Sequence, residues 1–134
     1  MSKPVLNVAL ALVARGDRWL VAKRRHGTHL GGLWEFPGGK RLPHESPARA
    51  AIRELWEECA VRATPEHILP QHTWEYDDRI VHLTPIICRW IDGEAHPHSA
   101  DVCRWVSADE LPQLEMPAVN AAIIRALSDH ARPT

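Results

Sequence analysis

The stretch Gly38–Val61, GGKRLPHESPARAAIRELWEECAV, decides how this chain is interpreted. Within it, Ser46 and Pro47 supply a hydrogen-bonding N-cap and then a proline at the first helical position, where its missing N–H costs nothing. An apolar stripe follows at helical spacing, made of Ala48, Ala51, Ile52, Leu55 and Cys59. The pattern therefore predicts an amphipathic helix that begins at Pro47 and buries this stripe.

The polar side of this helix carries three glutamates on one narrow arc. Glu54, Glu57 and Glu58 stand at positions i, i+3 and i+4, so a turn of about 100° per residue places them together. Arg53 offsets part of their mutual repulsion by pairing with Glu57 four residues on. Two interpretations follow from the spacing: a solvated acidic face, or a site for a hard divalent cation, which prefers carboxylate oxygens.

The residues before the helix favour the cation site. Gly38 and Gly39 are expected to break a short strand at Trp34–Phe36 and to leave a backbone carbonyl able to approach a cation. Glu45 lies at the mouth of the helix, where the macrodipole favours a carboxylate. Glycines, a short loop and an acidic helix together form a place where Mg²⁺ can bridge protein carboxylates and substrate phosphates.

This stretch resembles the signature of a known family. Gly39, five residues, Glu45, seven residues and then Arg53–Val61 are similar to the Nudix box, GX5EX7REUXEEXGU, with every charged position matched. Ala60 departs from the box, which has a glycine there to end the helix in a left-handed conformation that alanine adopts at a steric cost. The departure concerns the local turn more than the cation site.

Within the family, the chain is most similar to the MutT-like hydrolases, which remove oxidised guanine nucleotides from the precursor pool. The similarity runs nearly end to end and includes Arg24, His29, Glu35–Lys40, Asp78, Arg79, Asp92–Glu94, Trp105 and Asn120. It implies a Nudix-type α/β/α sandwich with a mixed β-sheet between helices, formed by residues 1–134 as a single domain. The coarse pattern of strands and two helices independently indicates an α/β (α+β) fold.

The resemblance also implies a catalytic set. The carbonyl of Gly38 with Glu54, Glu57 and Glu58 would bind Mg²⁺, with Mn²⁺ as the alternative, and Glu54, Arg53 and Glu57 would form the catalytic group. Glu54 would be a ligand or the base for the attacking water, and Arg53 would hold the carboxylates through charge-assisted hydrogen bonds. Water would attack a bridging phosphorus and release a nucleoside monophosphate and pyrophosphate.

The family also uses a further acid from a downstream loop. The matching position here is Ser99, with Asp101 nearby, so this role stays unassigned.

Asn120 is the candidate for reading the base. Oxidation at C8 turns N7 of guanine into a donor while O6 remains an acceptor, and an asparagine amide offers the complementary acceptor and donor. Unmodified guanine would set two acceptors against each other, at a cost of about 1–3 kcal/mol for each buried unsatisfied group. The alternative is that Asn120 caps the final helix.

The other substrate candidates have equally ordinary alternatives. Arg24 and His29 are expected to approach the sugar or the phosphates, and Phe36 is expected to contribute to the base pocket. The guanidinium of Arg79 is expected to stack on the purine, and its neighbour Asp78 is a further substrate-binding candidate. Phe36 is otherwise plain core, and Arg79 a solvated strand end.

The rest of the chain is expected to supply strands and a final helix. The expected elements are a hairpin of Val5–Ala14 and Trp19–Arg24, a second hairpin of Gln71–Tyr76 and Arg79–Trp90, a strand at Cys103–Val106 and an amphipathic helix after Pro117. Thr64 and Pro65 are expected to open a connector, Pro85 to lie at an edge or bulge, and Asp92-Gly93 to form a hairpin turn.

Composition limits the partners. A net charge of −1 gives no global attraction to a nucleic acid polymer or an acidic membrane, and no apolar stretch approaches a membrane span. The three cysteines form no CxxC pair, which argues against a disulfide framework or zinc knuckle and for the reducing cytoplasm. We expect a cytoplasmic protein, favoured as a monomer, that acts on a small-molecule nucleotide.

The functional prediction is Mg²⁺-dependent hydrolysis of 8-oxo-dGTP to 8-oxo-dGMP and pyrophosphate, a step of nucleotide-pool sanitation and DNA repair. The first alternative is a Nudix hydrolase for CTP, a methylated pyrimidine triphosphate or ADP-ribose. The second is a non-catalytic reader of oxidised guanine, because Leu30–Gly39 also resembles the C-terminal domain of MutY. Such readers lack the full acidic box, which this chain keeps.

Overall fold

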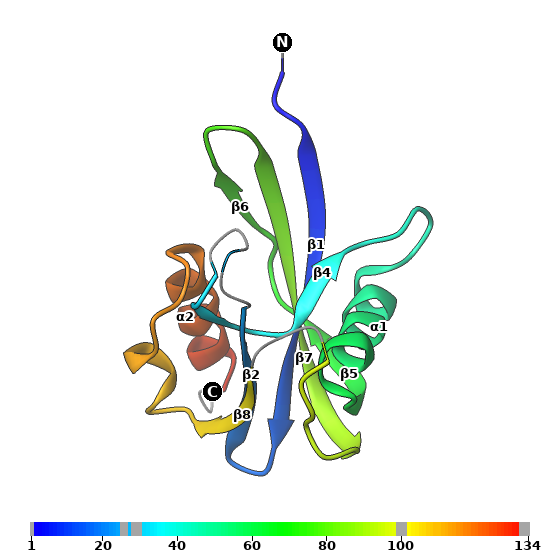
Figure 1. Ribbon diagram of the computed structural model, residues 1–134, viewed down its shortest axis with the longest axis vertical. Coiled ribbons are helices and arrows are strands. Elements are labelled where there is room, and N and C mark those ends of the chain that lie inside the picture. The colour runs from blue at the N-terminus through cyan, green and yellow to red at the C-terminus, as the bar shows by residue number, and fades with distance from the viewer. Residues whose placement is uncertain (1, 25–26, 28–30, 99–101, 132–134) are drawn as a thin grey trace.

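The structure is a computed structural model that describes residues 2–24, 27, 31–98 and 102–131. These residues form an eight-stranded mixed sheet and two α-helices (Figure 1). The order is β1 (Val5–Arg15), β2 (Arg18–Lys23), β3 (Trp34–Glu35), β4 (Gly38–Lys40), α1 (Pro47–Cys59), β5 (Arg62–Ile68), β6 (His72–Glu75), β7 (Ile80–Asp92), β8 (Val102–Ser107), a 3₁₀ turn at Leu111–Gln113 and α2 (Val119–Ala131).

The sheet combines both strand directions. Its main path is β3-β2-β1-β7-β5, and β4, β6 and β8 pair with β1, β7 and β2 respectively. The long strands β1 and β7 run parallel, from Val5 opposite Ile80 to Ala14 opposite Arg89, whereas the other pairs are antiparallel. The predicted mixed sheet is confirmed, as are the hairpins β1–β2 and β6–β7.

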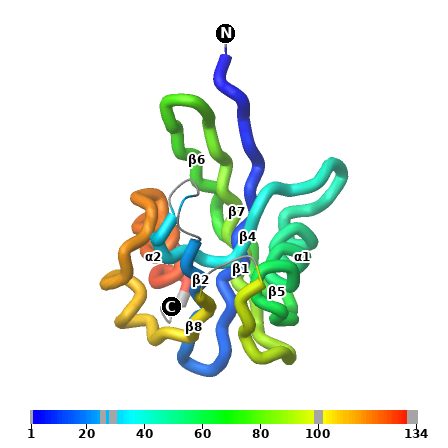
Figure 2. The backbone as a smooth tube through the Cα atoms, in the orientation of Figure 1, coloured from blue at the N-terminus to red at the C-terminus, as the bar shows by residue number. Residues whose placement is uncertain are grey.

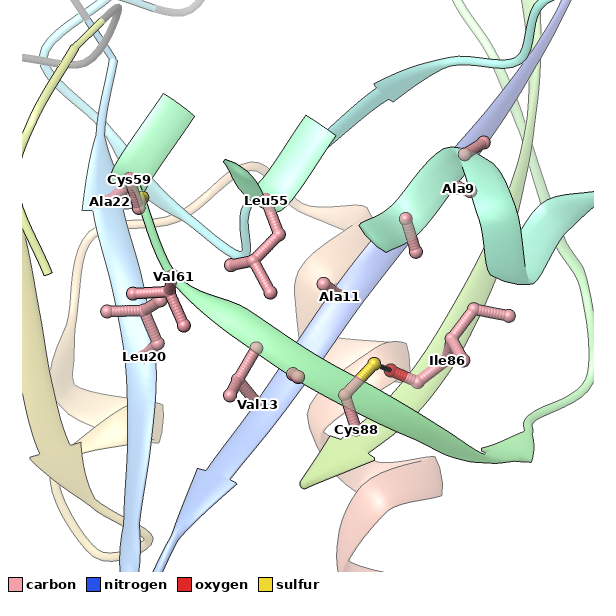
Figure 3. Close-up of a cluster of buried hydrophobic side chains, with 13 residues drawn as sticks. Ala9, Ala11, Val13, Leu20, Ala22, Leu55, Cys59, Val61, Ile86 and Cys88 are labelled. Atoms are coloured by element: carbon pink, nitrogen blue, oxygen red, sulfur yellow. Dashed lines mark hydrogen bonds between the residues drawn. The ribbon is translucent and has the colours of Figure 1, made fainter. Parts of the chain in front are cut away.

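One helix covers each face of the sheet (Figure 1). Alternate residues of β1 supply the two cores: Ala9, Ala11 and Val13 pack on the side of α1, and Leu10 and Leu12 on the side of α2. The small alanines let α1 lie close to the sheet (Figure 3). This arrangement is the predicted α/β/α sandwich.

Helix α1 begins as the sequence predicts. Ser46 is the N-cap, and its hydroxyl accepts a hydrogen bond from Arg49 N at 3.2 Å. The helix ends at Cys59, and Ala60 adopts the left-handed conformation with φ 57° and ψ 35° while its N–H donates to the Trp56 carbonyl at 3.0 Å. Alanine therefore takes the C-cap conformation that the box assigns to glycine.

Three local predictions were wrong. The expected connector at Thr64 and Pro65 is strand β5, which the pattern concealed because its residues Pro65–Ile68 are exposed and show no alternation. Gly38 and Gly39 do not simply break a strand, since they form β4 and pair with β1. Asp92-Gly93 makes no hairpin to the next strand, because β8 pairs with β2 instead.

Pro85 was predicted at an edge or a bulge, and it lies in the interior strand β7, at the point where the pairing of β7 changes from β5 to β6. Its carbonyl accepts a hydrogen bond from Leu69 N at 2.9 Å, in the segment between β5 and β6. A residue's N and C=O point to the same side of a strand, so the missing proline N–H faces this interruption in the pairing. A central strand tolerates the proline there because no ladder bond is lost.

Candidate active site

A cavity of about 370 Å³ lies where β4 meets the N-terminal part of α2. The backbone of β3 and β4 runs from the α2 side of the molecule to the α1 side (Figure 2), and both strands contribute residues to the lining of this cavity. Its lining includes three glutamates, Glu35, Glu54 and Glu58, and we call this part of the lining the acidic end. The lining also includes apolar side chains of β1 and β7 together with Tyr76, Arg79 and Asn120.

Gly39 lets a carboxylate reach strand β4. A Cβ atom built on Gly39 would lie 2.5 Å from the carboxyl carbon of Glu54 and 2.7 Å from each of its oxygens. Such distances are shorter than any side chain tolerates, so a residue larger than glycine would push Glu54 out of the cavity wall. The glycine that the sequence pattern required before the helix thus has a direct steric role at the carboxylate.

Glu58 lies in the same wall, and its carboxyl group has a raised pKa. Gly38 N donates a hydrogen bond to Glu58 Oε2 at 3.0 Å. Burial, and next the neighbouring carboxylate of Glu35, raise the pKa of Glu58 to about 8, although the Gly38 N–H lowers it. Near pH 7 this side chain is therefore largely protonated in the absence of a compensating cation.

Glu35 is the member of this acidic end that the sequence analysis did not assign. Its carboxylate forms an ion pair with Arg24 Nη1 at 3.3 Å, and burial raises its pKa in spite of that arginine. In the sequence, Glu35 stands between Trp34 and Phe36, so in a strand its side chain points to the face opposite the two aromatic side chains. This pattern was the available signal that Glu35 has a separate role. Its approach to Glu58 depends on β4 returning beside α1, which no local pattern shows.

Arg53 connects the loop before α1 with the glutamates on it. It donates to both carboxylate oxygens of Glu45 at 2.8 and 3.0 Å, to Glu54 Oε1 at 2.9 Å and to the Lys40 carbonyl at 3.0 Å. It also makes the expected pair with Glu57, at 3.1 Å. The hydrogen bonds from Arg53 and from Leu42 N lower the pKa of Glu45 to about 2.

The donor set at the acidic end fits a hard divalent cation. Glu54 and Glu58 present carboxylate oxygens to one cavity, and burial disfavours the charged form of Glu58, a penalty that a bound cation would offset. Among residues 2–24, 27, 31–98 and 102–131, no three His, Cys, Asp or Glu side chains already stand close enough together to chelate an ion. Glu57 is the outlying member, since its side chain is 54% exposed and bound to Arg53.

The structure distributes the predicted substrate residues unevenly. Arg24, Arg79 and Asn120 line the cavity. Phe36 is fully buried in the core beneath α2, and the exposed Asp78 contacts Arg79 Nε at 3.5 Å. His29, Ser99 and Asp101 lie outside the described residues.

Asn120 stands at the second position of α2, so it is not that helix's N-cap. Its side chain is directed into the molecule: the residue is 4% exposed, and Nδ2 donates to Met116 Sδ at 3.6 Å. Tyr76 is a cavity residue that the sequence analysis missed, and the Arg79 guanidinium lies 5.7 Å from its ring centre. A buried amide and an aromatic side chain thus line the same cavity as the glutamates.

The fold and this acidic wall define a class of protein. Residues 8–126 match the family model described as NUDIX domain, so the chain belongs to the Nudix family and is a hydrolase of pyrophosphate bonds. Nudix enzymes act on small-molecule nucleotide substrates and generally use divalent metal ions. In addition, none of the helices that the structure describes is long and apolar enough to cross a membrane.

Particular relatives are similar over most of the chain. "Phosphatase NudJ" of Escherichia coli strain K12 is 34% identical over 117 residues, which cover 84% of this chain and 74% of NudJ. The solution structure of the E. coli ORF135 protein is 31% identical with a TM-score of 0.80, covering 98% of this chain and 96% of that one. The MutT protein from Methanosarcina mazei has a TM-score of 0.87 at 23% identity over 98% of this chain and 99% of that chain, a likeness of fold.

Proposed function

We propose that this chain is a Mg²⁺-dependent nucleoside triphosphate pyrophosphohydrolase whose preferred substrate is 8-oxo-dGTP. The observation that carries the proposal is one cavity whose lining holds two kinds of chemistry. Carboxylates form its acidic end, where a cation and polyphosphate would bind, and a buried amide lines the same cavity, where a base would bind. The apolar side chains of β1 and β7 in the same lining suit a flat purine.

Glu54 and Glu58, with the Gly38 carbonyl, would hold the ion, and Glu57 would join them on leaving Arg53. When bound, Mg²⁺ neutralises phosphate charge and makes bound water more acidic. Glu54, whose carboxyl group packs against Gly39 in the cavity wall, would orient the attacking water and take its proton. Arg53 would fix Glu54 and the loop before α1 through its hydrogen bonds to Glu54 and Glu45.

Base selection is proposed for Asn120. Its amide can present an acceptor to N7–H and a donor to O6 of an oxidised guanine, after Nδ2 leaves the weak contact with Met116 Sδ. The position is nearly closed to water, so a mismatched hydrogen-bonding edge would stay unsatisfied. Arg79 and Tyr76 line the same cavity, where a base would stack. Arg24 would approach the phosphates or sugar from beside Glu35.

A second candidate is release of inorganic phosphate from a nucleotide diphosphate or triphosphate. It is favoured by the name of the 34% identical relatives, which are phosphatases. The same acidic end would serve both reactions, and the two differ in which phosphorus the water attacks. The substrate alternatives CTP, methylated pyrimidine triphosphates and ADP-ribose belong to the same comparison.

The test is a product analysis with purified protein and Mg²⁺. We would measure rates and phosphorus products for 8-oxo-dGTP, dGTP, CTP, 5-methyl-dCTP and ADP-ribose by ³¹P NMR. The proposal expects 8-oxo-dGMP and pyrophosphate, with kcat/KM at least about tenfold above that for dGTP. Orthophosphate as the product would favour the second candidate, and equal rates on dGTP would remove the assignment of Asn120. Hydrolysis lost in Glu54→Gln would dispose of the non-catalytic reader.

A further inference from the structure

Two thiols meet at the C-terminal end of α1. Cys59 is the last residue of this helix, and Cys103, 44 positions later, is the second residue of β8. Cys103 Sγ donates to Cys59 Sγ at 2.9 Å, closer than van der Waals contact between two unbonded sulfur atoms. Both residues are free cysteines, and the proposed hydrolysis uses neither thiol.

The fold, and not one side-chain rotamer, holds these residues together. Cys103 is the register partner of Ala22 on β2, and Ala22 belongs with Cys59 to the buried cluster under α1 (Figure 3). On the other side, His96 N donates to the Cys59 carbonyl at 2.8 Å and so holds the segment that leads toward β8 against the helix end. Backbone pairing therefore positions both cysteines.

The two thiols differ in access. Cys59 is fully buried, whereas Cys103 is half-buried at the edge of the same cluster. A small oxidant would meet Cys103 first and find Cys59 immediately behind it. The third cysteine, Cys88, is fully buried and donates to the Ile86 carbonyl at 3.4 Å, which makes it a matched control.

We propose that Cys59 and Cys103 form a reversible intramolecular disulfide on exposure to hydrogen peroxide, fastening the C-terminal end of α1 to β8. The Sγ–Sγ separation of 2.9 Å has to shorten to the bond length of about 2.05 Å, a change of about 0.9 Å. A side-chain rotation of this size leaves the strand register unchanged. The inference does not depend on which nucleotide the enzyme hydrolyses.

The oxidation balances without a further reagent. The Cys103 thiolate attacks one peroxide oxygen, the O–O bond breaks, and the leaving hydroxide takes up a proton to become water. Cys59, on losing its proton, attacks the sulfur of the resulting sulfenic acid, and the S–O bond breaks as a second water leaves. Two electrons pass from the sulfur pair to the peroxide oxygens. A dithiol reductant reverses the change by thiol–disulfide exchange.

The disulfide should stabilise the fold, because it closes a long loop in the unfolded chain. We expect the melting temperature of the oxidised protein to exceed that of the reduced protein by roughly 10 °C. Amide hydrogen exchange should slow at the last turn of α1, since local opening of that turn would separate the two cysteines.

The experiment treats the native protein with hydrogen peroxide and measures intact mass, cross-linked peptides and melting temperature, without any nucleotide. We expect wild type and Cys88→Ala to lose about 2 Da, to yield a Cys59–Cys103 linked peptide, and to regain the mass with dithiothreitol. Cys103→Ser should lose none.

Oxygen adducts alone, a disulfide that includes Cys88, or a link between two chains would overturn the proposal. A melting temperature that is unchanged or lower would overturn the fastening of α1. If Cys103→Ser does not fold, the linked peptide from wild type still decides the matter. Nucleotide hydrolysis is a separate measurement, so failure of the proposed function leaves these outcomes intact.

Discussion

Replacing Glu58 by glutamine should make the cation-free protein more stable at alkaline pH. Glu58 ionises with a pKa of about 4.5 in the unfolded chain and about 8 in the folded protein, so folding favours its protonated form. This preference adds to the free energy of unfolding in full below about pH 4.5, and the added stability is lost as the pH rises through about 8. The wild-type protein should therefore lose stability across this window.

The size of the effect follows from the pKa difference. A shift from 4.5 to about 8 corresponds to about 5 kcal/mol as an upper limit, of which about 3–4 kcal/mol falls between about pH 5 and pH 8. Glutamine keeps an oxygen for the Gly38 N–H but has no charge to desolvate. Glu58→Gln should remove most of the pH-dependent loss.

The assay is urea denaturation at several pH values between 5 and 8.5 with EDTA present. Glu57→Gln is the matched control, because it makes the same change one position earlier on a side chain that is 54% exposed. The control should retain the wild-type pH dependence, and Mg²⁺ should restore stability at pH 8 in wild type but not in Glu58→Gln. A Glu58→Gln variant with the same pH dependence as wild type would refute the reasoning.

Four further changes probe the site and its support. Gly39→Ala should lower kcat/KM at least about 100-fold, because its Cβ meets the Glu54 carboxyl group; an active variant would contradict this. Asn120→Ala should narrow the preference for 8-oxo-dGTP over dGTP by about tenfold or more in competition kinetics. Arg53→Met should lower the free energy of unfolding measured by urea denaturation, since it leaves Glu45 and Glu54 without their partner. Ala60→Gly should raise the melting temperature by a few degrees by relieving the left-handed alanine.

Local sequence patterns predicted the chemistry-bearing helix well. The N-cap Ser46 and the start at Pro47 depend on residues within a few positions of one another. The grouping of the three glutamates around one cation stays a prediction, because Glu57 is paired with Arg53. The turn at Ala60 was not predicted, because alanine replaces the glycine of the box there, and the structure shows that the alanine adopts the left-handed C-cap conformation. Helical periodicity is a local property, so a single sequence carries it.

Features that depend on contacts between residues far apart in the chain could not be predicted from local sequence patterns. Strand β5 shows no alternating pattern, and its place beside β7 is set by tertiary pairing. The encounter of Glu35 with Glu58 and that of Cys59 with Cys103 both require strands that return from elsewhere in the chain. Pro85 was assigned to an edge or a bulge because a proline lacks an N–H, but the sequence does not show where the neighbouring pairing is interrupted.

The central claim is that the acidic wall formed by α1 and β4 binds a divalent cation. Isothermal titration of Mg²⁺ and Mn²⁺ into the protein, compared with Glu54→Gln and Glu58→Gln, tests this claim most directly. The account predicts saturable uptake by wild type that weakens at least about tenfold in each variant. Absence of uptake by wild type, or equal uptake by all three proteins, would contradict it.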